Sequence, residues 1–458
     1  MLIKPILDPE FISAAVWNQD YRRRVRESGG DPLVIALERG PGAVSVWQTQ
    51  VLPHGGDNIA LNHRYIERAL KFLLWQRGGH RVTIAGNPLI AGYLNAVYSP
   101  HGPRAFDHAF MGERVYKAPF EIVACSLADA PQPAERSSPL GRHTNGCRIG
   151  FDLGGSDRKC AAMIDGDVVF SEEVVWDPYY QTDPRYHFDG INDSLRRAAA
   201  HLPRVDAIGG SAAGVYINNE PRVASIFRGL SPAQFESDVR PIFHRLRECW
   251  NNVPFMVVND GEVAALGASM TLGENAVLGV SMGTSMAAGY VTPDGFITDW
   301  LNELAFAPLD YRDPASRDEW SGDDGVGAQY FSQQAVSRLL PAAGIDVPAD
   351  MPFAKRLVHV QELMAAADPR ARRIFETIGV YFGHAIANYA EFYELRHVLV
   401  MGRVTTGEGG DIIVNEARRV LEADFPEHAD VQLHLPGEQD KRHGQAAAAA
   451  TLPALEEH

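Results

Sequence analysis

Cysteine is scarce in this chain, and it has neither long apolar runs nor an excess of positive charge. Only four of the 458 residues are cysteine, and none forms a Cys-x-x-Cys pair. This excludes the usual zinc knuckles and disulfide scaffolds and favours a reducing compartment. No run of 18 apolar residues occurs, so we expect no transmembrane helix and no membrane partner. The first residues lack the features of a secretory signal, and we therefore expect a cytoplasmic protein.

The charge balance is acidic. Aspartate and glutamate number 58 against 42 lysines and arginines, which gives a net charge of −16. Such a surface attracts nucleic acid poorly, so we expect no nucleic-acid partner. The hydrophobic fraction of 45% is typical of globular proteins, and the length favours two to four domains.

Proline, serine and small residues are concentrated at residues 128–146, which predicts a linker or long loop. Before it, predicted strands at residues 33–37 and 44–51 and an amphipathic helix at residues 63–76 indicate a small α/β region. After it, strands and helices alternate, which is typical of an α/β fold with a largely wound sheet. A single helix is expected around residues 232–251.

The segment DLGGSDRK, residues 152–159, places a carboxylate at the end of a predicted strand, followed by two glycines. Glycines let backbone N–H groups approach a phosphate closely, and a nearby carboxylate can hold hydrated Mg²⁺. The alternative is a plain hairpin with Asp152 at its corner. Lys159 either reaches a phosphate or points to solvent. The segment is not a Walker A loop, because that pattern is absent.

The segment LGVSMGTSMAAG, residues 278–289, predicts a second hairpin with a turn rich in glycine and hydroxyl groups, suited to phosphate. It includes a G-x-S-x-G match at residues 279–283. A nucleophile elbow needs a helix after the turn, whereas a return strand is expected here, so a serine hydrolase is disfavoured.

Asp260 lies in NDGEVAALGAS, residues 259–269, between an apolar strand and a helix of small residues. A carboxylate there can act as a general base toward an attacking hydroxyl, and Asn259 can hydrogen-bond the same ligand. The alternative is that Asp260 is only a helix N-cap.

The segment VLVMGRVTTGEGG, residues 398–410, predicts a buried strand that ends at Gly402. A glycine-rich loop then precedes a helix at residues 412–423. This geometry suits contact with a nucleotide base or ribose, and it is equally that of an ordinary strand–loop–helix joint.

Taken in order, the four segments resemble the actin-like ATPase domain, and more narrowly the ROK family of bacterial repressors and sugar kinases. DLGGSDRK is similar to the family's phosphate-1 pattern D-x-G-G-T-[KN], and NDGEVAALGA to its N-D-A-N-A-A-A-L-G-E segment. LGVSMGTS resembles the phosphate-2 segment, and MGRVTTGEGG resembles the adenosine segment loosely. The resemblance covers residues 148 to about 452.

The resemblance implies an α/β, actin-like ATPase fold of the ribonuclease H-like type, in which ATP and Mg²⁺ lie between two lobes. It implies phosphorylation of a sugar or polyol hydroxyl, with Asp260 as catalytic base and Asp152 holding Mg²⁺, and a possible homodimer. The residues implied to contact phosphate are Gly154, Gly155, Ser156, Lys159, Gly283, Thr284 and Ser285. Those implied near adenosine are Gly402 and Gly410, and those implied near the acceptor are Asn259, Glu303 and Asn219.

The chain departs from the family pattern in several segments, among them those that carry the family's histidine and its zinc ligands. The family's G-E-I-G-H corresponds to residues 302–306, where Glu303 is kept and Phe306 replaces the histidine. The family's zinc-binding cysteine segment corresponds to residues 321–332, which contain no cysteine, so no structural zinc is expected.

The N-terminal 130 residues have no counterpart in a simple ROK kinase. We therefore expect an α/β accessory domain at residues 1–130, a linker at 131–147, one ATPase lobe at 148–270 and a second at 271–458. The C-terminal helix of the second lobe is expected to return to the first.

Two other functions remain open on the same fold. A non-catalytic sugar or nucleotide sensor is favoured by the lost histidine and the altered segment at residues 321–332, whereas the retained Asp260 argues against it. A phosphohydrolase of the exopolyphosphatase type is the third hypothesis, and it would release phosphate without a sugar acceptor.

Overall fold

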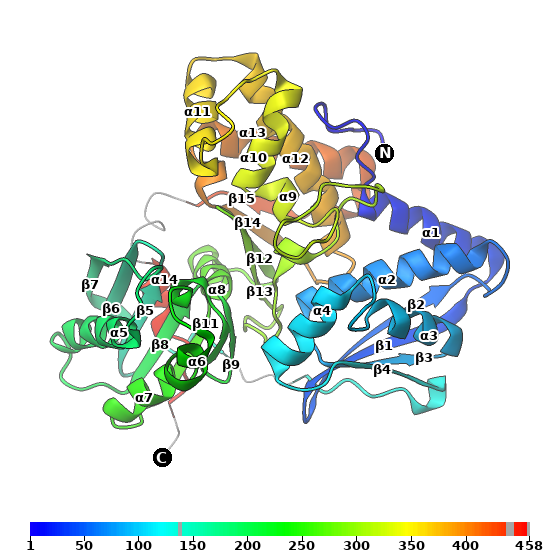
Figure 1. Ribbon diagram of the computed structural model, residues 1–458. Helices are drawn as coiled ribbons and strands as arrows, with labels where there is room; N and C mark the ends of the chain where they lie inside the picture. The colour runs from blue at the N-terminus through cyan, green and yellow to red at the C-terminus, as the bar shows by residue number, and fades with distance from the viewer. Residues whose placement is uncertain (136–139, 437–443, 456–458) are drawn as a thin grey trace. The chain divides into compact units, whose positions relative to one another are not determined.

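The structure is a computed structural model that describes residues 1–135, 140–436 and 444–455. It divides into two compact units (Figure 1). Unit 1 comprises Met1–Arg136, Val280–Ala288 and Asp299–Leu435, and unit 2 comprises Ser137–Gly279, Gly289–Thr298 and Pro436–His458. The domain boundaries expected from the sequence stay a prediction, and residues 136–139 of the expected linker lie outside the described residues. Among the described helices, none has the length and apolar character needed to span a membrane.

Unit 2 is built on a five-stranded sheet with the order β11-β8-β5-β6-β7. Strands β5, β6 and β7 form an antiparallel meander, whereas β8 and β11 run parallel to β5. The strands are β5 (Cys147–Leu153), β6 (Asp157–Ile164), β7 (Asp167–Val175), β8 (Ala207–Ala212) and β11 (Phe255–Asn259), with a separate ribbon of β9 (Val215–Ile217) and β10 (Glu220–Val223). The helices are α5 (Pro184–Ala199), α6 (Pro232–Gln234), α7 (Ile242–Cys249), α8 (Asp260–Leu272) and α14 (Gly444–Ala450).

Strand β5 separates two packed layers because its side chains alternate between the faces of the sheet. Ile149, Phe151 and Leu153 belong to the hydrophobic core that includes α5 and α7. Arg148 lies in the alternate set, and its guanidinium donates to the Pro453 carbonyl oxygen just beyond α14 (2.7 Å). Asp152 is in the same alternate set, so the strand pattern alone directs its carboxylate away from the core.

Helix α14 approaches the sheet closely because glycines lie beneath it. A Cβ atom at Gly150 would lie 1.7 Å from the Ala446 carbonyl oxygen, and one at Gly209 equally close to the Ala449 carbonyl oxygen.

Gly150→Ala is therefore expected to lower the free energy of unfolding by about 1–3 kcal/mol, the usual cost of overpacking. Gly267→Ala in α8 is the matched control. Its Cβ would meet Ala448 at an ordinary 3.5 Å, and a helical Gly→Ala change is favourable. Equal stability of the two variants in chemical denaturation would contradict the packing described here.

Unit 1 contains two four-stranded sheets within the described residues, with the orders β2-β1-β3-β4 and β13-β12-β14-β15. The first pairs β1 antiparallel with β2 and β3, and β3 parallel with β4. Helix α3 packs on β3 and β4, and α2 packs on α3 (Figure 1). The chain enters unit 1 within β12 and leaves it within β13.

The bounds of the unit 1 elements follow. The strands are β1 (Asp31–Gly40), β2 (Ala43–Val51), β3 (Arg81–Ala85), β4 (Glu121–Cys125), β12 (Val277–Met282), β13 (Met286–Val291), β14 (His397–Met401) and β15 (Gln432–His434). The helices are α1 (Ala14–Ser28), α2 (Asn58–Gln76), α3 (Pro88–Val97), α4 (Ala105–Ala109), α9 (Ala328–Phe331), α10 (Gln333–Ala343), α11 (Phe353–Ala365), α12 (Pro369–Tyr389) and α13 (Glu408–Asp424).

The N-terminal segment is an integral part of unit 1. The Asp8 carboxylate accepts hydrogen bonds from Tyr381 (2.6 Å) and from the guanidinium groups of Arg312 (2.8 Å) and Arg338 (3.1 Å). The last carbonyl groups of α2 accept from the backbone N–H groups of residues 302 and 303 (2.8 and 2.9 Å). These bonds join the N-terminal residues to the segment that carries Glu303.

Two predicted elements are wrong. The helix expected around residues 232–251 is interrupted, because α6 passes into a short π-helical turn and α7 begins only after Pro241. The glycine-rich loop expected up to Gly410 is also shorter than predicted. Helix α13 begins at Glu408, and Gly410 is buried in its first turn, where a Cβ would lie 2.3 Å from the Thr405 carbonyl oxygen.

Candidate functional site

Asp152 lies near the carboxyl end of β5, where the neighbouring strands place Ser211 and Lys159 opposite it. The Ser211 hydroxyl donates to Asp152 Oδ1 (2.7 Å), and Lys159 Nζ lies 3.9 Å from Oδ2. The Asp152 side chain is 9% exposed. Burial raises the pKa of Asp152 to about 6, and the charge of Asp260 adds to that rise, whereas Ser211 and Lys159 oppose it. A bound cation would therefore stabilise the ionised form of Asp152.

The raised pKa of Asp152 predicts how the stability of the metal-free protein depends on pH. Because the pKa in the folded state lies above the ordinary value of about 3.9, this group favours the folded state most at low pH. That contribution is lost as the pH rises through about 6. A shift of about two units corresponds to roughly 3 kcal/mol. We therefore expect Asp152→Asn, in the presence of a chelator, to be the more stable protein at pH 8 by up to about this amount.

At pH 4 the same comparison is expected to show little difference between the wild type and Asp152→Asn. Chemical denaturation at both pH values measures it, with Asp157→Asn as the control. A stability difference between the wild type and Asp152→Asn that does not change with pH would contradict the burial of a charged Asp152.

Lys159 faces the two carboxylates of this turn. Its Nζ lies 3.3 Å from Asp157 Oδ1, besides its contact with Asp152. The side chain lies against the acidic turn, and its contact with a phosphate stays a prediction. This places a cation beside the predicted phosphate-binding segment.

The turn of Gly154, Gly155 and Ser156 is closed by the residues that follow β7. Trp176 Nε1 donates to the Gly154 carbonyl oxygen (2.8 Å). The Trp176 backbone N–H donates to the Ser156 carbonyl oxygen (3.1 Å). A Cβ at Gly155 would lie 2.0 Å from the Tyr179 hydroxyl oxygen, so only glycine leaves room for that hydroxyl. No local sequence pattern indicated Trp176 or Tyr179 in this role.

Asp260 opens α8 directly after β11. The N-cap is Asn259, whose side chain accepts a hydrogen bond from the Gly261 N–H (2.7 Å). Asp260 Oδ1 also accepts from that N–H at 3.1 Å, and burial raises the pKa of Asp260. Because Asn259 supplies the cap, the capping role considered for Asp260 does not explain why a carboxylate stands at this position.

Gln445 of α14 connects the two carboxylate positions, and sequence reasoning missed it. Its Nε2 donates to Ser211 Oγ (3.0 Å) and to the Asp260 backbone oxygen (2.9 Å). Ser211 in turn donates to Asp152, so one chain of hydrogen bonds runs from Asp152 to the start of α8. Gln445 stands in an alanine run, and no local pattern distinguishes it.

The two asparagines predicted to contact an acceptor are used within the protein. Asn219 donates to the Phe255 carbonyl oxygen (2.8 Å) and accepts from the Val257 N–H (2.7 Å), which ties β11 to the β9–β10 ribbon. Asn259 donates to the Gly214 carbonyl oxygen (2.7 Å) in addition to its cap. Both side-chain amides therefore organise the backbone around Asp260.

Unit 1 carries the remaining predicted residues. Gly283 lies with the exposed Thr284 and Ser285 in the turn between β12 and β13, and its carbonyl oxygen accepts from the Gln333 N–H (2.9 Å) at the start of α10. Gly402 has a positive φ of 103°, and a Cβ there would lie 2.5 Å from the Met282 carbonyl oxygen. The ends of β12 and β14 thus meet at these glycines.

Glu303 is half-buried and stands just before the short helix Leu304–Phe306. The Phe306 ring packs with Trp75 and Trp320 at centroid distances of 4.6 and 4.8 Å. Phe306, at the position where the resemblance implies a histidine, therefore belongs to an aromatic cluster.

Asp152 suits a magnesium ion held mainly by water and phosphate. Mg²⁺ is commonly bound by one or two carboxylates together with substrate phosphates, and Asp152 is a buried carboxylate whose pKa is raised. Among the described residues, no group of three or more histidine, cysteine, aspartate or glutamate side chains is placed to hold a metal. A metal ion at Asp152 would therefore need further ligands from water or from a bound molecule.

Comparison with known proteins identifies the fold. No family model and no curated protein matches the sequence. A ROK hexokinase from Thermus thermophilus matches the structure with a TM-score of 0.52 and 20% identity, over 67% of this chain and 97% of that chain. The chain therefore has the actin-like ATPase fold found in ROK sugar kinases, and the fold class predicted from the motifs is confirmed.

Two other solved structures are similar at lower scores. A ROK family glucokinase from Streptomyces griseus, in complex with glucose and AMPPNP, gives a TM-score of 0.49 at 21% identity, over 67% of this chain and 98% of that chain. A ROK family transcriptional regulator, a homolog of the E. coli MLC protein, gives 0.48 at 16% identity, over 67% and 78%.

Proposed function

We propose that this protein transfers the γ-phosphoryl group of ATP to a hydroxyl group of a sugar or polyol. The observation that carries the proposal is the pairing of Asp152 and Asp260 in unit 2. Asp152 is buried and Asp260 is half-buried, both lie at the carboxyl ends of strands in one sheet, and Ser211 and Gln445 connect their positions. The sugar kinase named above supports this function through its shared fold.

Asp260 acts as the general base. The acceptor oxygen attacks the γ-phosphorus, the bond from that phosphorus to the leaving ADP oxygen breaks, and the hydroxyl proton passes to the Asp260 carboxylate. Because burial raises the pKa of Asp260, the ionised carboxylate is a stronger base than an exposed aspartate. The hydrogen bonds of Asn259 and Gln445 hold the backbone at this position.

Asp152 and Lys159 serve the phosphates. Asp152 would hold Mg²⁺, directly or through water, and the ion when bound neutralises phosphate charge. Lys159, which lies beside Asp152, adds a positive charge. The turn of Gly154, Gly155 and Ser156 faces the phosphates, and the Ser156 hydroxyl exchanges its bond to Asp157 (2.8 Å) for one to phosphate. In unit 1, Gly283, Thr284 and Ser285 form the second phosphate turn, and Gly402 and Gly410 belong to the predicted adenosine segment. Phosphoryl transfer requires chiefly such positioning and charge neutralisation.

A sugar sensor without turnover is the second candidate. It is favoured by Asn219 and Asn259, whose amides are engaged by the protein's own backbone, and by Phe306 within the aromatic cluster. A sensor retains nucleotide or sugar binding and shows no phosphoryl transfer.

The first test is ADP release with ATP and Mg²⁺ across hexoses, amino sugars, heptoses and polyols. Turnover with one acceptor class supports the kinase. Nucleotide or sugar binding without turnover supports the sensor, and phosphate release that needs no acceptor supports a phosphohydrolase. The kinase proposal fails in either of the last two cases.

A further inference from the structure

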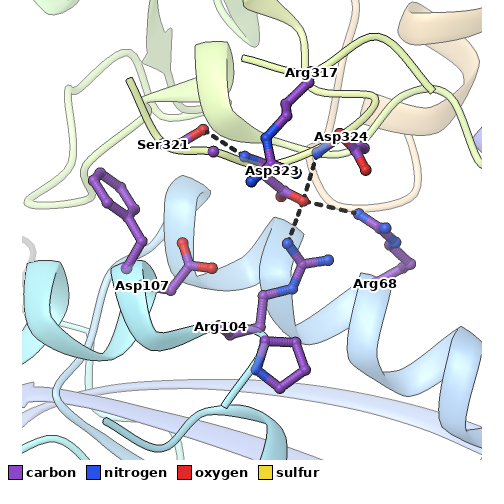
Figure 2. A pocket seen from close by; sticks show the side chains of 10 residues that line it. Arg68, Arg104, Asp107, Arg317, Ser321, Asp323 and Asp324 are labelled. Carbon is purple, nitrogen blue, oxygen red and sulfur yellow. Dashed lines mark hydrogen bonds and ion pairs between the residues drawn. The ribbon is translucent and has the colours of Figure 1, made fainter. Parts of the chain in front are cut away.

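A polar cavity lies entirely within unit 1, and none of its lining residues is assigned to phosphoryl transfer. Its volume is about 260 Å³, below the range usual for drug-sized ligands. Side chains from the α2 and α4 region form one wall, and the segment of residues 317–324 forms the other (Figure 2). The cavity therefore has the size for one small ring or a short chain of polar carbons.

Buried ion pairs around Asp323 join the two walls of the cavity. Its carboxylate contacts Lys71 Nζ at 3.0 Å, lies 3.9 Å from Arg68 Nη1, and pairs closely with Arg104 (Figure 2). These cations hold the pKa of Asp323 far below its usual range, so it stays ionised. Asp107 is engaged in the same way by Lys71 (2.8 Å) and by Trp75 Nε1 (2.7 Å). These carboxylates build the walls and are not free to bind a ligand.

The segment that carries Asp323 also keeps polar groups available. Arg317 and Asp324 stand opposite each other in an antiparallel bridge, yet neither side chain makes an ion pair in the part of the chain that the structure describes. Across the cavity, the buried Arg68 Nη1 has no hydrogen-bond partner among the described residues. Arg68 Nη1 is thus a buried donor without a hydrogen bond, and the exposed Arg317 and half-buried Asp324 leave their charged groups available to a ligand in the cavity.

The charges around the cavity indicate the kind of ligand. Arg68, Arg104 and Arg317 are balanced by Asp107, Asp323 and Asp324, so the lining has no net charge. A charged ligand would lose its hydration without a net attraction in return. A hydroxyl group both donates and accepts, so adjacent hydroxyls can bond a guanidinium and a carboxylate together. The Phe106 ring adds an apolar surface for carbon-bound hydrogens.

We propose that this cavity binds a neutral polyhydroxyl compound of about one sugar ring, held by Arg317, Asp324 and Arg68. The site does not depend on the proposed phosphoryl transfer, because no residue assigned to that reaction lines it.

Isothermal titration calorimetry on the full chain without nucleotide tests the site. The probes are neutral hexoses, hexitols and inositol, with inorganic phosphate, gluconate and glucosamine as charged comparators. Loss of one hydrogen bond to a charged group corresponds to about tenfold to hundredfold weaker binding. We expect that loss in Arg317→Gln and in Asp324→Asn.

The matched controls change the same kinds of charge outside the lining. Arg114→Gln and Glu319→Gln alter exposed residues of unit 1 and are expected to bind normally. Neutral binding that is unchanged in both cavity variants would overturn the proposal. So would binding of charged probes only, or of no probe. Turnover by the wild type in any of these cases would leave the kinase proposal standing.

Discussion

Replacing Asp260 by asparagine is expected to lower the rate of phosphoryl transfer by about 10²–10⁴-fold, the usual contribution of a general base. Asparagine keeps the size of the side chain and cannot accept the hydroxyl proton. The Asn259 cap and the Gln445 contact to the Asp260 backbone remain, so the fold around the site should persist. Steady-state kinetics should show the loss in kcat, with nucleotide affinity measured by calorimetry nearly unchanged.

Asp167→Asn is the matched control for this variant. Asp167 is an exposed aspartate at the start of β7 in the same unit, and its replacement is expected to leave kcat unchanged. A full rate in Asp260→Asn would show that another group takes the proton, and the mechanism proposed here would be wrong.

Replacing the buried Lys71 by methionine is expected to destabilise the protein by about 3–5 kcal/mol. Lys71 is fully buried and contacts both Asp107 and Asp323. Removing one partner of a buried ion pair leaves the opposite charges without compensation, which is far more costly than removing both. Chemical denaturation should show the loss, and the double variant Lys71→Met with Asp323→Asn should lose less than the sum of the single variants.

Asp324→Asn is the control for the Asp323 change, because it removes the same charge one residue further along the chain. The Asp324 side chain makes no ion pair within the described residues. It is expected to change stability little. Additive effects in the double variant would mean that Lys71 and Asp323 do not depend on each other.

Local pattern was sufficient to predict the elements that carry the carboxylates. The apolar run before Asp152 predicted β5, and the small-residue helix after Asp260 predicted α8, because both rest on short-range periodicity. The helix at residues 232–251 was wrong because Pro241 interrupts it, and propensity over the whole window concealed that break.

Contacts between distant residues could not be read from the sequence. Ser211 meets Asp152 only because β8 pairs in parallel with β5, and Gln445 lies 234 residues from Ser211 along the chain. Lys71 and Asp323 are separated by a similar number of residues along the chain. Taken alone, each has the charged side chain typical of a surface residue. The joining of the N-terminal segment to the Glu303 segment depends on backbone bonds that no side-chain pattern encodes.

The most direct test of the central claim is the mass of the acceptor after incubation with ATP and Mg²⁺. Phosphoryl transfer predicts a phosphorylated acceptor formed in equal amount to ADP by the wild type and nearly absent with Asp260→Asn. ADP and free phosphate without any phosphorylated acceptor would contradict the claim, as would unchanged ATP beside a bound sugar.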